Sequence, residues 1–431
     1  MVGLLGALLL VSCAMPIAPG TASPTDIPRP PLPTAAVCPG LPDDTTAPAP
    51  PAPDPLLDDT ETHSAAQDSP MKFDTSQPLK YDVASNTIVL GNGAPADIPA
   101  LARKLKRDDL LRPLASGEWL LLANLWIGKQ VTFQIAAPSV QRLKLRSDTT
   151  MFVSIKTYGG RLTFDGVCVT SWDTVHNTVA TDYSIGRSFV LARDGARMDI
   201  LNSEMSYLGF LANESYGVAW RLPGTTGSAS NSRFGHNFYG LYSYEASDLV
   251  IRGNEVHHSI RYGIDPHTRS NRLLIENNIS HHNGKQGIIL AEECNDSTIR
   301  NNTVYANSLH GIVIYQRSNH NLVEGNTSFG NALQGININD SSGNTIRGNT
   351  VYENAEVGIG VGQNAADNLV VGNTVRNNGR DGIYLFSEAI RNTIRDNTVH
   401  DNVRFGIYAK SAGNTVEGNH VSGNPSGDVR E

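Results

Sequence analysis

Short apolar runs separated by Asn and Gly recur along the chain from about residue 150 onwards. A typical unit reads xNLVIxGNTVxxNxxxGIxI, in which apolar and polar residues alternate over runs of three to five residues. This period of two is typical of β-strands, and the Asn and Gly positions predict sharp turns between them. Each unit therefore predicts three short strands and no helix.

Two ladders of identical residues give the repeat its length. The Gly that precedes an Ile, Val or Leu recurs every 23 or 24 residues at Gly217, Gly240, Gly263, Gly287, Gly311, Gly335, Gly358, Gly382 and Gly406. An Asn recurs in step with it at Asn254, Asn278, Asn302, Asn326, Asn349, Asn373, Asn397 and Asn419. Two independent ladders predict a solenoid, in which each Asn can bond to its own copy one coil away.

We predict an all-β fold, a right-handed parallel β-helix over residues 150–425 with coils of 23–24 residues. The leucine-rich consensus, the WD dipeptide and the paired helices of other repeat proteins are absent from the sequence. Residues 79–149 are predicted to form an N-terminal cap. Its stretch DIPALARKLKRDDLL, beginning at Asp97, predicts a capped amphipathic helix, and residues 117–136 predict the first strands.

The N-terminal part of the chain predicts export. Residues 1–22 contain a short apolar stretch typical of a signal peptide, and residues 23–78 form a Pro/Ala-rich segment that predicts a disordered linker. The ending LVSC at Cys13 resembles a lipoprotein cleavage box, although no Lys or Arg precedes the apolar run. We therefore expect a periplasmic, cell-surface or secreted protein, either tethered to a membrane through lipidated Cys13 or released by an ordinary signal peptide.

Charge and cysteine content narrow the classes of ligand. The net charge of −8 argues against a general nucleic-acid binder, although it leaves a polyanionic ligand open because the local charge of a groove decides binding. The spacing of the four cysteines predicts no zinc site. We expect Cys168 and Cys294 to be buried thiols, because a bridge between them would span several coils.

One repeat carries chemistry that its neighbours lack, in the stretch RYGIDPHTRS at residues 261–270. Behind each ladder Gly, the first and third positions are apolar in successive coils, as Ile264 and Pro266 are in this one. These positions therefore face the core, and alternation directs Asp265 and His267 outward on the opposite face. Tyr262, just before Gly263, is expected to share that outer face.

Because stacked coils lie roughly 4.8 Å apart, equivalent residues form columns. The columns around His267 predict a patch of Tyr, His, Arg and acidic side chains on one face. Beyond the central residues it contains Arg221, Tyr242, Tyr244, Arg269, Lys285, Glu292, His310 and Arg317. These columns therefore predict an aromatic and cationic groove on the outer face.

The string YGIDPHTRS resembles the YG(F/I)DPH signature of the mannuronan C5-epimerases, and flanking segments resemble the periplasmic, biosynthetic branch of that family. The resemblance covers about residues 80–420. It implies a β-helix that converts β-D-mannuronate to α-L-guluronate within alginate. It also implies that Tyr262, Asp265 and His267 lie at the active centre, and that His310 and Glu292 are further site residues.

The chain also departs from that family. Where the biosynthetic branch has an Arg near position 292, this chain has Glu292 and Glu293, and where the secreted branch has a Lys it offers only Arg233 and His236. The calcium-binding nonapeptide modules of the secreted branch are absent from the sequence. We therefore expect no bound calcium or other metal, no cofactor, activity that survives EDTA, and a monomer.

Epimerisation at C5 removes a proton next to a carboxylate and returns one to the opposite face. It needs a base, an acid and cations or donors that stabilise the added charge. We assign proton transfer to His267 and Tyr262 in either order, orientation or substrate binding to Asp265, and charge stabilisation to Arg221, Arg269, Arg317 and Lys285. Two alternatives are a polyuronate lyase, which shares the first step, and a surface protein that binds polysaccharide without catalysis.

Overall fold

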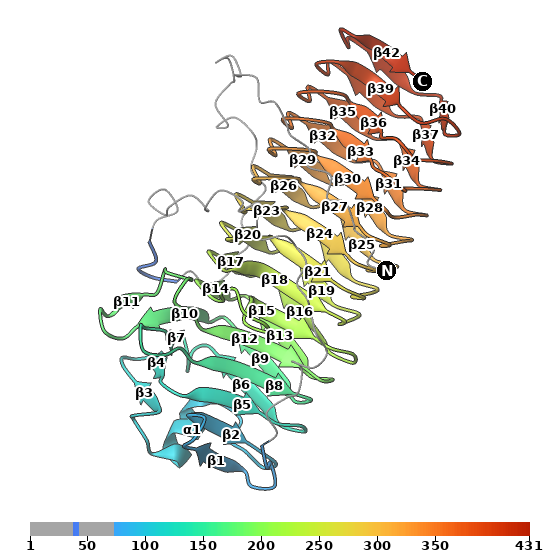
Figure 1. Cartoon of the computed structure of the whole chain (residues 1–431). Coiled ribbons are helices and arrows are strands. Elements are labelled where there is room, and N and C mark those ends of the chain that lie inside the picture. The colour runs from blue at the N-terminus through green and yellow to red at the C-terminus, as the bar shows by residue number, and fades with distance from the viewer. Residues whose placement is uncertain (1–37, 43–72) are drawn as a thin grey trace, which may run out of the picture. The chain divides into compact units, whose positions relative to one another are not determined.

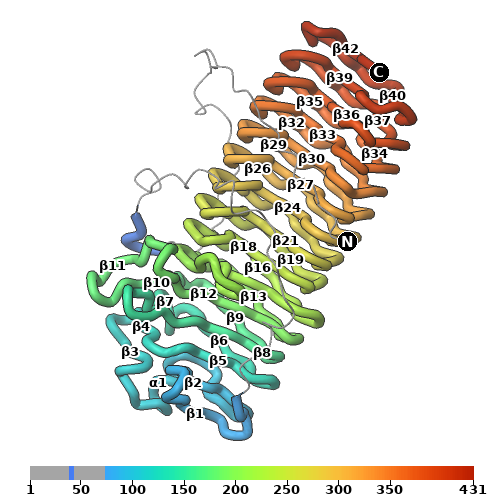
Figure 2. The backbone as a smooth tube through the Cα atoms, viewed as in Figure 1, coloured from blue at the N-terminus to red at the C-terminus, as the bar shows by residue number. Residues whose placement is uncertain are grey.

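The computed structural model describes residues 38–42 and 73–431 of the chain. These residues fold almost wholly into strands, and α1 (Ile98–Leu105) is the single helix among them. Strands of successive coils stack in chain order from β1 to β42, as Figures 1 and 2 show. The predicted parallel β-helix is confirmed.

Three long sheets run along the stack, and we call them sheets one, two and three. Sheet one comprises β1 (Leu79–Asp82), β2 (Thr87–Leu90), β5 (Asn124–Ile127), β8 (Ser154–Tyr158), β12 (Phe189–Arg193), β15 (Gly217–Arg221), β18 (Tyr239–Tyr244), β21 (Ile264–His267), β24 (Ile288–Ala291), β27 (Ile312–Tyr315), β30 (Ile336–Asn339), β33 (Ile359–Val361), β36 (Ile383–Leu385), β39 (Phe405–Ala409) and β42 (Gly427–Arg430). Sheet two comprises β3 (Leu111–Pro113), β4 (Glu118–Leu121), β7 (Arg142–Arg146), β10 (Cys168–Asp173), β11 (Thr178–Val179), β14 (Glu204–Ser206), β17 (Arg233–Gly235), β20 (Glu255–His257), β23 (Ile279–His281), β26 (Thr303–Tyr305), β29 (Thr327–Phe329), β32 (Thr350–Tyr352), β35 (Thr374–Arg376), β38 (Thr398–His400) and β41 (His420–Ser422). Sheet three comprises β6 (Thr132–Ala136), β9 (Arg161–Asp165), β13 (Arg197–Leu201), β16 (Thr226–Ser230), β19 (Val250–Arg252), β22 (Leu274–Glu276), β25 (Thr298–Arg300), β28 (Leu322–Glu324), β31 (Thr345–Arg347), β34 (Leu369–Val371), β37 (Thr393–Arg395) and β40 (Thr415–Glu417).

A regular coil passes once through each sheet. The coil that carries RYGIDPHTRS runs through β20 in sheet two, β21 in sheet one and β22 in sheet three before β23 begins the next coil. The strands of neighbouring coils pair in parallel, as β18, β21 and β24 do. Each sheet is therefore a set of columns of equivalent residues, which is the arrangement expected from the Gly ladder.

The Asn ladder lies buried in the turn between sheets three and two and holds consecutive coils together. Nδ2 of Asn278 donates to Oδ1 of Asn302 at 2.9 Å, and Nδ2 of Asn302 donates to Oδ1 of Asn326 at 3.0 Å. Each side chain also bonds to backbone, as Asn302 does to the carbonyl of Ile275 at 2.9 Å. The predicted bonding of each Asn to its own copy is confirmed, and it satisfies polar groups that would otherwise be costly to bury.

The core is an unbroken apolar column inside the coils. The residue that follows each ladder Gly in the regular coils, Ile264 and its equivalents from Ile288 to Ile407, has no exposed surface. The inward direction expected for the first position behind the Gly is therefore confirmed. Burial of these branched side chains in every coil stabilises the stack by roughly 25 cal/mol for each Å² of apolar surface removed from water.

The cap closes one end of the stack with the predicted helix. Asp97 caps α1 because its Oδ1 accepts a hydrogen bond from the backbone N–H of Ala100 at 2.7 Å. The helix ends at Leu105, earlier than the periodic stretch suggested, because Lys106 adopts a left-handed backbone with φ of 50°. Within residues 38–42 and 73–431, no helix has the length and apolar character needed to cross a membrane.

The expectation that Cys168 is a buried thiol is wrong. Cys168, at the start of β10, forms a disulfide with Cys38, and the two residues are 130 positions apart in sequence. The backbone N–H of Cys38 also donates to Oε2 of Glu204 at 2.7 Å. Spacing alone could not reveal this pair, because Cys38 lies in the segment interpreted as linker. Cys294 is a buried free thiol as expected.

The predicted signal peptide, Cys13 and most of the predicted linker lie outside the described residues.

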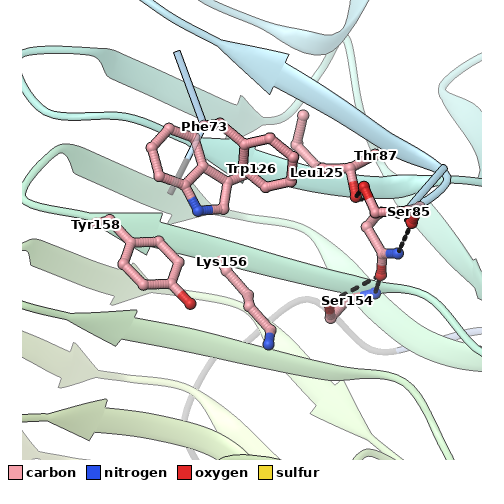
Figure 3. A pocket seen from close by; sticks show the side chains of 9 residues that line it. Phe73, Ser85, Thr87, Leu125, Trp126, Ser154, Lys156 and Tyr158 are labelled. Carbon is pink, nitrogen blue, oxygen red and sulfur yellow. Dashed lines mark hydrogen bonds between the residues drawn. The ribbon is translucent and has the colours of Figure 1, made fainter. Parts of the chain in front are cut away.

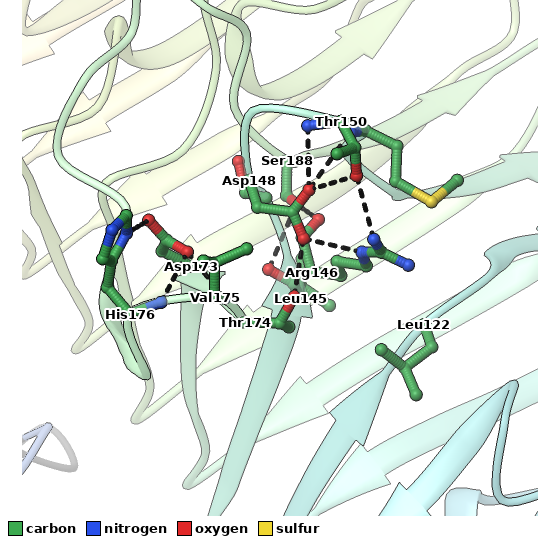
Figure 4. Close-up of polar contacts among 12 residues, drawn as sticks. Leu122, Leu145, Arg146, Asp148, Thr150, Asp173, Thr174, Val175, His176 and Ser188 are labelled. Carbon is green, nitrogen blue, oxygen red and sulfur yellow. Dashed lines mark hydrogen bonds and ion pairs between the residues drawn. The ribbon is translucent and has the colours of Figure 1, made fainter.

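The loop that follows β7 is fixed by one buried carboxylate, Asp148 (Figure 4). Its oxygens accept hydrogen bonds from Nε of Arg146 at 2.8 Å, from Oγ1 of Thr150 at 2.5 Å and from Oγ1 of Thr174 at 2.6 Å. Burial acts to raise the pKa of Asp148, but these bonds outweigh it and hold that pKa below its usual range. Asp148 is therefore a structural anion that ties the loop to sheet two.

Candidate active site

Asp265 and His267 lie on the outer face of sheet one, in β21. Ile264 in the same strand is fully buried against the core, and alternation places the next and fourth residues on the opposite face. Asp265 pairs with Tyr242 of the preceding coil, and His267 pairs with Tyr244. The predicted columns around these residues are confirmed by the strand register.

The two columns extend over many coils. The column of Asp265 contains Trp126, Lys156, Leu191, Ala219, Tyr242 and Asp265. The column of His267 contains Tyr158, Arg193, Arg221, Tyr244, His267, Ala291 and Tyr315. A register shift between Gly217 and Ala219 pairs Gly217 with Tyr239, so Tyr216 and Tyr239 are not strictly equivalent as the Gly ladder suggested.

The outer face is packed rather than open to solvent. Asp265 is 1% exposed and Tyr262 is 5% exposed. A second apolar cluster, separate from the core, covers this face and includes Tyr216, Tyr239 and Tyr242. The expectation that Asp265 points away from the core is confirmed, but its side chain is buried on the outer face rather than exposed to solvent.

His267 belongs to a short chain of hydrogen bonds. Its Nδ1 lies 2.7 Å from Oγ1 of Thr268, and that hydroxyl donates to Oε2 of Glu292 at 2.8 Å. The Thr268 hydroxyl has one proton, so when it donates to Glu292 its oxygen accepts from the Nδ1–H of His267. The lone pair of the neutral ring then lies on Nε2, which is the tautomer that a base needs.

Thr268 and Glu292 occupy the turn that follows sheet one, where both have positive φ angles of 30° and 61°. This conformation brings Glu292 beneath His267, with Oε2 3.8 Å from Nδ1. Sequence reasoning included Glu292 but missed Thr268. The position of Thr268 directly after His267 was the signal that the sequence offered.

Tyr262 lies before β21 and is accompanied by a cation. Nζ of Lys285 donates to the phenol oxygen of Tyr262 at 3.3 Å. The Tyr262 ring stacks on Tyr239 of the preceding coil, with centroids 5.5 Å apart. Two of the predicted site residues, Tyr262 and Lys285, are thus brought together, and stacking fixes the direction of the phenol.

Arg221 is fully buried in the column of His267. Its Nη1 donates to Oδ1 of Asn213 at 3.1 Å and lies 3.4 Å from Oε1 of Glu214. Its guanidinium also lies over the Tyr244 ring, 4.9 Å from the centroid. A guanidinium in this setting provides a fixed positive charge on the outer face of sheet one.

Arg269 and Arg317 are placed differently from Arg221. Both lie in the turn after sheet one with exposed side chains, and each pairs with a glutamate of the preceding coil, Arg269 with Glu245 and Arg317 with Glu293 at 2.9 Å. These pairs form a row along the edge of the sheet.

His310 and Tyr242 complete the predicted set. Burial lowers the pKa of His310 to about 4, so its ring is neutral at pH 7. Nδ1 of His310 accepts from the backbone N–H of Gln334 at 3.3 Å. The Tyr242 ring centroid lies 6.2 Å from that of His267. His310 therefore provides a polar neutral group rather than a cation.

The outer face contains cations that sequence reasoning missed. Lys156 lies in the column of Asp265 and Arg193 in the column of His267. Glu214 bridges them, since it pairs with Arg193 and its Oε2 lies 3.8 Å from Nζ of Lys156. Burial, together with the charge of Arg193, lowers the pKa of Lys156 to about 8.

Beside Lys156 the same face is hollowed into a cavity of about 120 Å³ (Figure 3). Trp126 stacks on Tyr158 there, with centroids 5.2 Å apart, and Ser154 lines the opposite side. An aromatic platform next to an ammonium group suits a ring that carries a carboxylate. The cavity lies four strands along sheet one from β21, through β12, β15 and β18.

Comparison with known proteins gives a family and several relatives. The family described as "Right handed beta helix region" matches residues 165–328 and 289–429. The mannuronan C5-epimerase of Pseudomonas putida is 32% identical over 190 residues, which are 41% of this chain and 36% of that protein. The mannuronan C5-epimerase AlgG of Azotobacter vinelandii is 29% identical over 195 residues, which are 42% of this chain and 36% of that protein.

This chain thus spans about a third of the length of these curated relatives. The resemblance found in the sequence is confirmed, because the relatives have the name of the family that it indicated. The crystal structure of the periplasmic alginate epimerase AlgG superimposes with a TM-score of 0.72 at 24% identity, covering 77% of this chain and 84% of that one. At this identity the superposition establishes a common fold.

Proposed function

The chain belongs to the family of right-handed β-helix proteins, and we propose that it is a mannuronan C5-epimerase, which converts β-D-mannuronate to α-L-guluronate residues within alginate. The observation that carries the proposal is the segment from Tyr262 to His267, which presents a phenol, a carboxylate and an imidazole on one cation-lined face. Relatives named mannuronan C5-epimerase support the same reaction.

His267 is proposed as the base that removes the C5 proton. Its chain of hydrogen bonds to Thr268 and Glu292 favours the tautomer with the lone pair on Nε2. When His267 takes the proton, the imidazolium is stabilised by the carboxylate of Glu292, 3.8 Å from Nδ1. This geometry favours His267 over Tyr262 as the base, a choice that the sequence left open.

Tyr262 is proposed as the acid that returns a proton to the opposite face of the sugar. Once its phenol has donated, the oxygen is negatively charged, and Nζ of Lys285 at 3.3 Å stabilises that charge. Stacking on Tyr239 limits the rotation of the ring. Asp265 is proposed to hold substrate or orient the pair from the strand between them, and no cofactor is needed because only protons move.

The anionic intermediate has an extra negative charge on the substrate carboxylate. Lys285 and Arg221 are the proposed cations nearest to the columns of Asp265 and His267, and Lys156 and Arg193 continue the positive face along the polymer. Tyr242, Tyr244 and His310 are proposed to contact sugar rings or hydroxyls. Arg269 and Arg317 are proposed to act at the edge, where their glutamate partners reduce their net charge.

The proposed location is the periplasm or another exported site. Disulfides form in oxidising compartments, and Cys38 and Cys168 form one here. A structural relative is described as a periplasmic alginate epimerase. Lipidation of Cys13 as a membrane tether and a monomeric state remain parts of the proposal, which mass spectrometry of the mature N-terminus and light scattering can test.

Incubation with polymannuronate in deuterated water tests the reaction. We expect guluronate signals to appear in the proton NMR spectrum together with loss of the C5 proton signal of the converted residues, because the returned proton comes from solvent. His267→Ala should abolish both changes. The matched control is His320→Ala, a histidine in the turn between sheets one and three that lies outside the proposed site.

The lyase alternative makes a different product from the same first step. If the intermediate expelled its C4 oxygen, ultraviolet absorbance from a 4,5-unsaturated uronate would rise as the chain length fell, and the epimerase proposal would be wrong. Binding of polymer without either product would indicate a polysaccharide-binding protein.

A further inference from the structure

A cluster of histidines lies at the edge of sheet two, away from the columns of Asp265 and His267. His236 follows β17, His257 ends β20 and His258 follows β20. One ring nitrogen from each residue lies within 4.8 Å of those of the other two. His236 and His257 are 8% and 3% exposed, and His258 is half-buried. The proposed reaction uses none of these side chains.

The local sequence makes room for this cluster. His257 pairs with Gly235 of the preceding coil, and a Cβ at Gly235 would lie 2.7 Å from Cε1 of His257. The His257 ring therefore occupies the space that a side chain at Gly235 would fill. His236 and His258 begin equivalent turns with φ angles of 57° and 51°, and their rings stack with centroids 5.1 Å apart. Three imidazoles from two coils thus converge on one point.

Two ring nitrogens of the cluster lie in direct contact. Nδ1 of His257 lies 3.0 Å from Nδ1 of His258. Two imidazole nitrogens meet at this distance either by sharing one proton or by directing both lone pairs at a cation. Zinc binds imidazole nitrogen at about 2.0–2.1 Å, so two ligands of one ion lie roughly 3 Å apart. One ring nitrogen of His236 lies within 4.8 Å of a ring nitrogen of each of the other two residues, so a movement of the His236 ring would be needed to bring it to the same ion.

We propose that His236, His257 and His258 bind one borderline transition-metal dication, of the class represented by Zn²⁺. Neutral imidazole is a preferred ligand of zinc, copper and nickel, whereas calcium and magnesium require oxygen ligands. The neighbouring carboxylate of Glu255 is engaged by Nε of Arg233 at 2.8 Å and by Nε2 of His281 at 3.2 Å. It contributes negative charge near the site without being one of the three ligands. The proposal revises the expectation of no bound metal.

The next coil has an equivalent pair of histidines, to which the described residues add no third ligand. His281 and His282 repeat the contact, with their Nδ1 atoms 2.8 Å apart, and His282 stacks on His258 with centroids 5.2 Å apart. Beyond them, Tyr305 stacks on His281 in place of a further ligand. Among the described residues, only the cluster that includes His236 brings three metal-ligating side chains within 4.8 Å of one another.

A bound ion would join two consecutive coils at the start of a turn. Residues 259–263 lead directly from His258 to β21 and include Tyr262. The ion would therefore stabilise the coils from which the proposed acid projects. Its existence does not depend on the proposed reaction, because the ligands lie on a different sheet.

Equilibrium dialysis of the full chain, without a histidine tag, against Zn²⁺ tests the site. We expect one bound ion per chain. His236→Asn and His258→Asn should each weaken binding by at least about 10–100-fold. Asn is chosen because it tolerates the left-handed backbone at these positions. His400→Ala is the control. His400 ends β38 as His257 ends β20, and β38 lies six strands beyond β20 in sheet two.

Thermal unfolding gives a second readout that is independent of enzymatic activity. Zn²⁺ should raise the Tm of the wild type and of His400→Ala, and EDTA should reverse the shift, because an ion that binds only the folded state stabilises it. Neither histidine variant should respond, although both should show the strand-rich circular dichroism of the wild type. Absence of binding, or equal binding by His236→Asn, His258→Asn and the wild type, would overturn the proposal whatever the reaction catalysed.

Discussion

Oγ1 of Thr268 lies 2.7 Å from Nδ1 of His267, and this contact sets which ring nitrogen can act as a base. The same hydroxyl donates to Glu292 at 2.8 Å, so it accepts the Nδ1 proton of His267. A part-buried hydrogen-bond chain of this kind orients the imidazole as well as fixing its tautomer. Thr268 is thus a positioning residue whose effect should appear in catalysis.

Thr268→Val should lower kcat roughly 10–100-fold while changing KM little, because the substitution removes the hydroxyl but keeps the shape of the side chain. The ring of His267 would then lose the partner that selects its tautomer. Steady-state kinetics on polymannuronate, with a pH profile of kcat, measures the effect. Thr298→Val, in β25 of sheet three, is the control and should leave the rate unchanged. Wild-type kcat in Thr268→Val would contradict the role.

Tyr262→Phe should lower turnover by about 10²–10⁴-fold and leave the fold intact. The ring that remains still stacks on Tyr239, so the variant loses the phenol oxygen and its contact with Lys285 but little packing. Turnover and Tm should be measured together. Tyr239→Phe is a matched control in the preceding coil, and a comparable fall in its rate would show that the effect arises from packing rather than from proton transfer.

The regular coils could be predicted because their length is nearly constant. A period of 23 or 24 residues fixes the strand register, so the Gly ladder correctly placed Tyr242 beside Asp265 and Tyr244 beside His267. The inward Ile column followed from the same alignment. Prediction worked here because a solenoid converts sequence spacing directly into neighbours in space.

Earlier coils could not be aligned in this way. Lys156 and Leu191 are partners in sheet one although 35 residues separate them, and this irregular spacing concealed the column that leads to Asp265. Asp265 is 1% exposed although it lies on the outer face, and alternation does not describe this burial. The bond between Cys38 and Cys168 joins a Pro-rich segment to a strand, and no periodic pattern links the two.

Removing the disulfide should destabilise the protein without removing the proposed active site. The Cys38→Ser, Cys168→Ser double variant opens a loop of 130 residues, and loss of such a crosslink typically costs about 2–5 kcal/mol in the free energy of unfolding. Urea unfolding of the wild type and the variant measures the difference. Dithiothreitol should lower the stability of the wild type and leave the double variant unaffected, and equal sensitivity of both would contradict the assignment.

Binding of anionic polymer should weaken between pH 7 and pH 9 because Lys156 loses its charge in that range. Its pKa is lowered to about 8 by burial and by Arg193, and Glu214 is the acidic group that faces it at 3.8 Å. Calorimetric titration with mannuronate oligomers at several pH values measures the change. Lys156→Met should remove this part of the pH dependence, whereas Lys129→Met, an exposed control, should retain it.

The same group affects stability with the opposite sign. Between pH 8 and its usual pKa of 10.5, Lys156 binds fewer protons in the folded state than in the unfolded state. The free energy of unfolding contributed by this group therefore rises with pH over that window. Denaturant unfolding of the wild type and Lys156→Met at pH 7.5 and pH 10 should show it, and identical pH dependence in both would contradict the lowered pKa.

Glu214 should compete with the carboxylates of the polymer for the cations of sheet one. It contacts Arg193, lies 3.4 Å from Nη1 of Arg221 and lies 3.8 Å from Nζ of Lys156, so one carboxylate occupies a cluster of three positive groups. Glu214→Gln removes the negative charge and should lower KM for polymannuronate by about 5-fold, equivalent to roughly 1 kcal/mol. The Tm should fall as well, because the cations then repel one another without a partner.

The control for Glu214 is Glu324→Gln, which removes an equal charge from the exposed pair with Arg347 on sheet three, outside the proposed site. Both variants make the net charge less negative by the same amount, so a general electrostatic effect would lower both KM values equally. A fall in KM confined to Glu214→Gln would locate the competition at Lys156, Arg193 and Arg221. An unchanged or higher KM in Glu214→Gln would mean that these cations do not bind the polymer.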